Sequence, residues 1–287
     1  MTEFVEIFEM GPRDGLQNEK RLIPAADKIA LVDLLSQAGF RRIEVTSFVS
    51  PKWVPQMGDA AQVMAGIRRA PGVSYAVLTP NMKGYEGAKA ARASEIAVFT
   101  SASEGFSKAN LNATIAESLE RLAPVAQAAK ADGIPVRGYV SVVTDCPFDG
   151  PTPPENVLRV ATALRDMGCY EISLADTIGQ ARPEAIDTML AAVLQEIPAD
   201  QLAGHYHDTA GRALANIDAS LARGLRVFDA AVGGLGGCPY APGAEGNVAT
   251  EKVAAHLAAR GYDTGLDMQI VEKAAAMARA MRGDADV

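Results

Sequence analysis

Two of the chain's three histidines, His205 and His207, are its most suggestive chemical feature. They lie in the segment AGHYHDT at 203–209, which is predicted as a β-strand. Alternate side chains of a strand point to the same face, so the two imidazoles share one face. If that face is the interior of a barrel, they form a ready pair of metal ligands. The alternative is a pair of polar core residues whose hydrogen bonds are satisfied by neighbours.

Two oxygen-bearing side chains are placed to join this pair. Asp14 follows the first predicted strand, which lies close to the seventh in a closed barrel of eight strands. Asn247 follows the last strand, so its carbonyl oxygen can reach the same point. Each has a simpler explanation. The segment PRDG at 12–15 is typical of a β-turn, and Asn247 is typical of a helix N-cap.

Charged residues inside predicted strands supply further candidates. Glu44 stands between Ile43 and Val45 in the second strand, so it faces a buried layer and needs a partner. Arg13 is the nearest partner that the topology offers, either in a structural ion pair or in a catalytic one. Asp176 ends the sixth strand, where it either supports the site or simply caps the next element.

The third cysteine lies in an unusual segment. Residues 233–246 hold six glycines and two prolines around Cys238, a composition typical of a loop that acts as a lid. On such a loop Cys238 can give or take a proton, and the sequence leaves open whether it is a covalent nucleophile. Cys146 and Cys169 are interpreted as inert.

The elements that must position these residues follow a regular alternation. Eight short runs rich in Val, Ile, Tyr and Phe alternate with Ala/Leu-rich amphipathic stretches such as 25–38, 114–132 and 248–260, at about 30 residues per unit. This pattern predicts an α/β fold, specifically a parallel (β/α)₈ TIM barrel. An open doubly wound sheet is the competitor, but Pro239 stands where the third glycine of a dinucleotide fingerprint belongs. The predicted strands are 4–9, 42–48, 74–79, 95–100, 136–143, 171–175, 203–207 and 227–232.

Length and composition are consistent with this fold. The 287 residues are expected to form a single catalytic domain, with the barrel at about 4–262 and a C-terminal helix at about 266–282 that packs under the barrel or joins a dimer contact. The net charge of −8 argues against nucleic acid as a partner, and no apolar run predicts a membrane span. Three scattered cysteines and no recognisable secretion signal favour a cytoplasmic protein.

Longer motifs carry a family resemblance over residues 5–265. They are GPRDGLQNE at 11–19, TSFVSPKWVPQM at 46–57, VLTPN at 77–81, RGYVS at 137–141, GCYEISL at 168–174 and GLGGCPY at 234–240. With these motifs the chain resembles the 3-hydroxy-3-methylglutaryl-CoA lyases, in the superfamily of barrel metal-dependent lyases. The resemblance implies retro-Claisen cleavage of 3-hydroxy-3-methylglutaryl-CoA to acetyl-CoA and acetoacetate. Alternatives are a related lyase for another branched 3-hydroxyacyl-CoA, of citramalyl or isohexenylglutaryl type, and a non-catalytic barrel that binds CoA esters or metal.

The resemblance also implies roles for individual residues. Arg13 would steady the developing enolate, Glu44 and Asp176 would support the site, and Cys238 would exchange a proton with the substrate. The residues implied to bind a divalent cation, most commonly Mg²⁺ or Mn²⁺, are Asp14, His205, His207 and Asn247. We further expect basic residues at the barrel mouth to meet the phosphates of coenzyme A, unless they are merely solvated. The candidates are Lys20, Arg21, Lys52 and Lys83.

Overall fold

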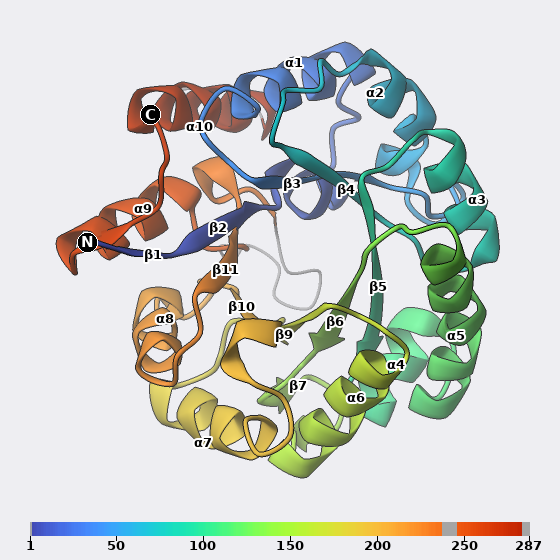
Figure 1. The fold of residues 1–287 in the computed structure, drawn as a ribbon, viewed down its shortest axis with the longest axis vertical. Coiled ribbons are helices and arrows are strands. Elements are labelled where there is room, and N and C mark those ends of the chain that lie inside the picture. Colours follow the sequence, from blue (N-terminus) through green and yellow to red (C-terminus); the bar gives the residue numbers. More distant parts are fainter. Residues whose placement is uncertain (1, 237–245, 283–287) are drawn as a thin grey trace.

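The computed structural model describes residues 2–236 and 246–282, and its centre is a closed barrel of eight parallel strands. In Figure 1 the barrel is viewed along its axis, with helices on the outside. Around the barrel each strand pairs with its neighbour, and the last pairs with the first, as the alternating pattern predicts. In order, the strands are β2 (Glu6–Glu9), β3 (Arg42–Ser47), β4 (Ser74–Leu78), β5 (Glu95–Ser101), β6 (Val136–Ser141), β9 (Glu171–Asp176), β10 (Leu202–Tyr206) and β11 (Val227–Ala230).

The helices cover the outer face of the barrel (Figure 1). Several have recognisable ends: the side chain of Thr114 caps α5 and exchanges hydrogen bonds with Glu117 in a capping box. Within the described residues the α-helices are α1 (Ala25–Leu35), α2 (Ala60–Gly66), α3 (Met82–Ala90), α4 (Glu104–Leu111), α5 (Ile115–Ala131), α6 (Pro154–Asp166), α7 (Pro183–Val193), α8 (Ala213–Ala222), α9 (Thr250–Ala259) and α10 (Met268–Arg282).

Two differences from the predicted elements have local causes. The segment 4–9 contains two strands, because β1 (Glu3–Phe4) pairs outside the barrel with β12 (Tyr262–Asp263), whereas β2 belongs to the barrel. The strand expected at 136–143 ends at Ser141, because Val142 adopts a left-handed backbone with φ 53°. The short strands β7 (Asp145–Cys146) and β8 (Gly150–Pro151) then form a hairpin beyond it.

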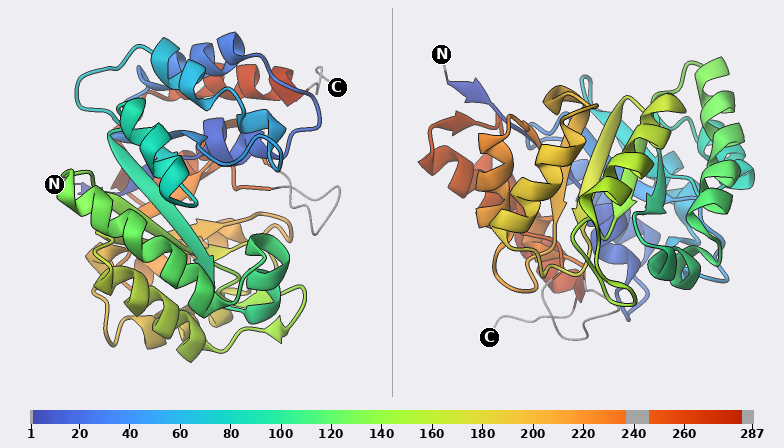
Figure 2. Two further views of the ribbon diagram at one scale, coloured as in Figure 1. Left: turned by 90° about the vertical axis from the view of Figure 1, so that its right-hand side faces the viewer. Right: turned by 90° about the horizontal axis from the view of Figure 1, so that it is seen from below.

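The predicted C-terminal helix is present as α10, two residues shorter at its start than expected. It packs against α1 and α9 of the same chain (Figure 2). Its buried positions are Val271, Ala274, Ala275, Ala278 and Met281, which form one face at helical spacing. Among the residues that the structure describes, no helix is long and apolar enough to cross a membrane.

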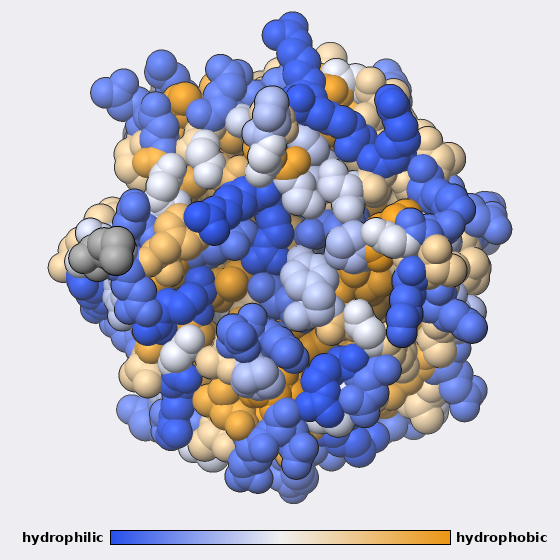
Figure 3. Space-filling model, in the orientation of Figure 1, coloured by the Kyte–Doolittle hydropathy of each residue, from blue (hydrophilic) through white to orange (hydrophobic). Residues whose placement is uncertain are grey.

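The barrel interior is polar at the N-terminal ends of its strands. Arg137 on β6 is completely buried and donates to Glu171 at the start of β9, at 2.6 Å. Glu171 also accepts from Arg42 at 2.9 Å, and Arg42 reaches Glu6 at 2.6 Å. Figure 3 shows hydrophilic residues across the middle of this face of the molecule. The network gives each of these buried charges a partner. It forms the floor of the barrel, at the end opposite to the carboxyl ends of the strands.

Candidate metal centre and active site

Asp14, His205 and His207 converge at the carboxyl ends of the strands. Asp14 lies in the short π-helical turn Gly11–Gly15 after β2, and its backbone N–H donates to the carbonyl of Met10 at 2.8 Å. His205 lies on β10 and His207 just after it, with ring centroids 5.3 Å apart. One potential ligand atom from each of the three residues lies within 4.8 Å of the others. This cluster is a candidate metal site formed by segments nearly 200 residues apart in the sequence.

Asn247 joins the cluster through its amide nitrogen. Its Nδ2 donates to Asp14 Oδ2 at 2.7 Å and to the carbonyl of Leu235 at 3.3 Å, and its backbone forms a β-bridge with His207. The expected ligand atom, the carbonyl Oδ1, is therefore at the other end of the amide. A half-turn about the terminal bond of the side chain would exchange the two atoms, but it would also break both of these hydrogen bonds, so a ligand role for Oδ1 remains a prediction.

The charges at this site suit a cation. Burial opposes ionisation of Asp14, but Arg13 and the two histidines outweigh it and hold the pKa of that carboxyl well below its usual range. Burial, together with His205, lowers the pKa of His207 to about 4, so its imidazole is neutral at physiological pH. Its Nδ1 is buried without a hydrogen-bond partner among the described residues. A carboxylate oxygen beside two imidazole rings is a donor set that a divalent cation fits.

Arg13 links the candidate metal site to a buried carboxylate. Its Nη1 donates to Asp14 Oδ1, and its Nε donates to Glu44 Oε2, each at 2.5 Å. Glu44 on β3 is fully buried, and it also accepts a hydrogen bond from the Tyr139 hydroxyl at 3.3 Å. Burial disfavours the charge on Arg13, but Glu44 and Asp14 outweigh that cost and raise the pKa of the guanidinium. The predicted neighbourhood of Arg13 and Glu44 is present, and it fixes a positive charge beside the candidate metal site.

Asp176 lies at the end of β9 with its carboxylate turned to backbone. Its Oδ1 accepts from the N–H of Gln180 at 3.2 Å, and its Oδ2 accepts from Ala181 at 2.9 Å. Burial raises the pKa of Asp176 to about 6. This geometry is the capping arrangement that the sequence offered as the alternative, and it shapes the loop that follows β9. Cys238, the expected proton donor, lies outside the described residues.

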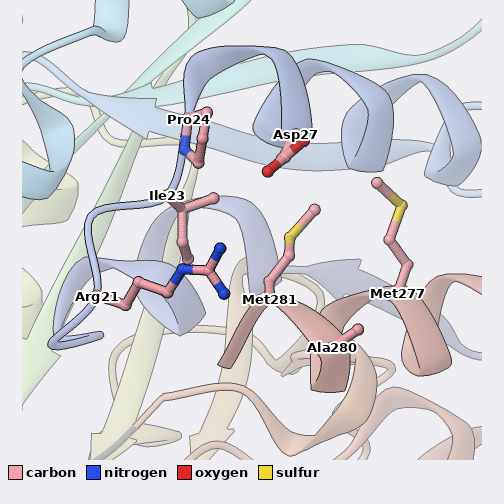
Figure 4. Close-up of a pocket in the computed structure, with 7 residues that line it drawn as sticks. All are labelled: Arg21, Ile23, Pro24, Asp27, Met277, Ala280 and Met281. Atoms are coloured by element: carbon pink, nitrogen blue, oxygen red, sulfur yellow. The ribbon is translucent and has the colours of Figure 1, made fainter. Parts of the chain in front are cut away.

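The four basic residues expected to meet coenzyme A are exposed and follow neighbouring strands. Lys20 and Arg21 come after β2, Lys52 after β3 and Lys83 after β4, on the side of the barrel where the strands end. Gln56 ties two of these segments together, because its amide nitrogen donates to the carbonyl of Arg21 at 2.8 Å. Arg21 also borders a cavity of about 230 Å³ between α1 and α10 (Figure 4).

Two buried carboxylates close to the site escaped the sequence reasoning. Asp229 on β11 contacts His205 Nδ1 at 3.1 Å, and Glu9 on β2 accepts from the N–H groups of Gly11 and Val232 and from the Thr250 hydroxyl. Both are charged residues within barrel strands. The signal that pointed to Glu44, a charged side chain inside a predicted strand, is also present at Asp229 and Glu9.

The fold and this geometry together define a (β/α)₈ barrel with a candidate divalent-cation centre at the carboxyl ends of its strands. Residues 4–278 match the family model described as HMGL-like. The bovine protein named hydroxymethylglutaryl-CoA lyase, mitochondrial, is 55% identical over 95% of this chain and 84% of its own length. A Pseudomonas aeruginosa protein named 3-hydroxy-3-isohexenylglutaryl-CoA/hydroxy-methylglutaryl-CoA lyase is 56% identical over 92% of this chain and 88% of its own.

Solved structures agree with the sequence relatives. The HMG-CoA lyase from Brucella melitensis is 62% identical and superposes with a TM-score of 0.97, covering 98% of this chain and 100% of its own. An HMG-CoA lyase from Acinetobacter baumannii, in complex with coenzyme A and 3-methylmalate, is 37% identical with a TM-score of 0.93, covering 98% of this chain and 92% of its own. The chain therefore belongs to the HMGL-like family, and the resemblance to HMG-CoA lyases stated from the motifs is confirmed.

Proposed function

We propose that this enzyme cleaves 3-hydroxy-3-methylglutaryl-CoA to acetyl-CoA and acetoacetate. The observation that carries the proposal is the cluster of Asp14, His205 and His207 beside Arg13, in a chain 55% identical to the bovine protein named hydroxymethylglutaryl-CoA lyase. In the reaction the substrate's tertiary hydroxyl loses its proton and the C2–C3 bond breaks. C3 becomes the ketone of acetoacetate, and the electron pair moves to C2 and into the thioester as an enolate. C2 then gains a proton to give acetyl-CoA.

Asp14, His205, His207 and Asn247 would hold a divalent cation, with Mg²⁺ or Mn²⁺ proposed. When bound, such an ion lowers the pKa of a coordinated hydroxyl and orients it. A basic group of the site would take the proton of the substrate hydroxyl: a carboxylate or, in a site where its Nε2 does not bind the cation, His205. The imidazoles of the cluster are largely buried, whereas the Asp14 side chain is 21% exposed. A substrate entering from the barrel mouth can therefore reach the cluster on the side of Asp14.

Arg13 would stabilise the enolate. Its guanidinium is held by Glu44 on one side and Asp14 on the other, so its charge is in place before the reaction begins. A preorganised donor of this kind contributes about 10²–10³ in rate. Cys238 would deliver the proton to C2, a step for which a positioned acid contributes about 10²–10⁴.

Lys20, Arg21, Lys52 and Lys83 would meet the phosphates of coenzyme A. Their segments follow three neighbouring strands, so a phosphate chain lying across the mouth can contact all of them. The complex of the Acinetobacter relative with coenzyme A supports an acyl-CoA ligand for this barrel.

The direct test is release of acetoacetate from 3-hydroxy-3-methylglutaryl-CoA by the purified enzyme. We expect activity that is lost after thorough chelation with EDTA and returns with Mg²⁺ or Mn²⁺. Activity that survives thorough chelation would exclude the metal mechanism, and absence of activity with metal present would exclude this substrate.

A second substrate has a specific observation in its favour, since the Pseudomonas relative is named for the isohexenylglutaryl thioester as well. A comparison of kcat/KM for the methyl, isohexenyl and citramalyl thioesters would decide between them. If kcat/KM for the isohexenyl thioester exceeds that for the methyl thioester by more than tenfold, the isohexenyl compound becomes the proposed substrate.

Location and assembly are proposed on simpler grounds. The proposed location is the cytoplasm, where the buried free thiols of Cys146 and Cys169 would remain reduced. A homodimer is the proposed assembly. The apolar face of α10 is occupied by its own chain, so a dimer contact would use other surfaces. Light scattering of the purified enzyme would show whether the particle has the mass of one chain or two.

A further inference from the structure

His205 has a buried carboxylate on the side away from Asp14. Its Nδ1 lies 3.1 Å from Asp229 Oδ2, while its Nε2 lies 3.9 Å from Asp14 Oδ2. The two residues are paired in the register of β10 and β11, so the contact follows from the sheet itself. A carboxylate accepts a hydrogen bond only from a protonated nitrogen. If the Nδ1 of a neutral ring carries the proton, the lone pair of Nε2 faces Asp14 and the candidate metal site.

Asp229 is itself held without freedom to rotate. It accepts from Arg137 at both oxygens, at 2.8 and 3.0 Å, and from the Ser173 hydroxyl at 2.8 Å. Arg137 is bonded in turn to Glu171 in the floor of the barrel. These contacts fix the position and orientation of the carboxylate.

We propose that Asp229 is a positioning residue that fixes the tautomer and ring orientation of His205, so that Nε2 is presented to the bound cation. The proposal rests on the metal site of the proposed function. Outer carboxylates of this kind change metal affinity by about 10–100-fold when they are lost. Asp229 acts only through His205, because Arg137, Ser173 and His205 occupy its described hydrogen-bonding contacts.

The tautomer can be measured in the metal-free enzyme, because the chain has only three histidines. In long-range ¹H–¹⁵N spectra of histidine-labelled protein at mildly alkaline pH, we expect His205 to carry its proton on Nδ1. His256 is an internal reference of the opposite kind. Its Nε2 lies 2.9 Å from Asp218, and its Nδ1 lies 3.1 Å from Arg260 Nη1. His256→Gln would identify its signals. A His205 ring protonated on Nε2 alone would overturn the proposal, and this measurement needs neither metal nor substrate.

The energetic consequence is tested with Asp229→Asn and titration of Mn²⁺ by calorimetry. We expect affinity about 10–100-fold weaker than in the wild type. Asp218→Asn makes the same change in the carboxylate that contacts His256, away from the candidate metal site, and should leave Mn²⁺ affinity unaltered. Ser173→Ala removes one donor to Asp229 but leaves its charge and its contact with His205, and should change affinity by less than about threefold.

The outcomes separate the two proposals. Equal Mn²⁺ affinity in Asp229→Asn and wild type would overturn the positioning role, as would an equal loss in Ser173→Ala and Asp229→Asn. Failure of the wild type to bind Mn²⁺ would instead overturn the proposed metal site. If Asp229→Asn does not fold, as judged by circular dichroism, the wild-type tautomer alone decides whether Asp229 directs His205.

Discussion

Replacing Glu9 with Gln is expected to stabilise the protein at alkaline pH and to change little at acidic pH. Glu9 is completely buried and accepts hydrogen bonds from Gly11 N–H at 2.8 Å, Val232 N–H at 3.0 Å and the Thr250 hydroxyl at 2.7 Å. Burial raises its pKa from 4.5 to about 7. A glutamine has nearly the same shape. Its oxygen can accept from the two backbone groups, and its NH₂ can donate to Thr250.

The magnitude follows from the pKa. Between pH 4.5 and about 7 the folded chain keeps the proton on Glu9 whereas the unfolded chain has lost it, so stability falls as pH rises through this window. One pKa unit corresponds to about 1.4 kcal/mol, so the full penalty is about 3 kcal/mol above pH 7. Glutamine carries no charge and escapes this penalty. The stability difference between variant and wild type should grow from about 1 kcal/mol near pH 5 to about 3 kcal/mol near pH 8.

Urea unfolding of both proteins at the two pH values measures this difference, and the pH dependence of all other groups cancels in the comparison. Thr250→Val removes a hydrogen bond that favours the ionised form of Glu9, so it should cost more stability at pH 8 than at pH 5. A Glu9→Gln advantage that is the same at both pH values, or a loss at pH 8, would refute this account of Glu9.

Three further predictions concern the site and the turn beneath it. Arg13→Ala should lower kcat for acetoacetate release by about 10²–10³, since the fixed charge beside Asp14 is lost; an unchanged kcat would remove Arg13 from the chemistry. Lys52→Ala should raise KM for the thioester with little change in kcat; if both constants are unaltered, Lys52 does not contribute to binding of coenzyme A. Gly11→Ala should destabilise the protein by about 1–3 kcal/mol in urea unfolding, because the new methyl would lie 2.6 Å from Glu9 Oε1; wild-type stability would show that this side chain can move aside.

Local pattern was sufficient to predict the fold. Each barrel strand lies where apolar β-branched residues are bounded by turn residues, and these signals are contained in short segments. The division of the expected strand at 4–9 into two strands has a tertiary cause. Val5 separates β1 from β2, and its N–H donates to Asp263, which is more than 250 residues away in the sequence. No local pattern contains that partner.

The site was predictable to the extent that topology alone places residues at strand ends. Asp14 and His205 were expected near each other because the first and seventh strands lie close together in a closed barrel, and they are. The contact between His205 and Asp229 depends instead on the register of β10 and β11, which is set by the stagger of the whole barrel. The orientation of the Asn247 amide depends on its hydrogen bonds to Asp14 and Leu235.

The buried carboxylates explain how side chains from distant segments stay aligned at one point. Glu9 binds Gly11 at the start of the turn that carries Asp14, and Thr250 just after Asn247, so one side chain ties both segments to β2. Asp229 holds His205 in the same way from β11. Loss of Asp229 removes such a hold and should weaken metal binding, whereas Glu9→Gln keeps the hydrogen bonds and should not. Equal Mn²⁺ affinity in Glu9→Gln and wild type is therefore expected alongside the gain in stability, and a loss of affinity would mean that the charge of Glu9 acts on the site directly.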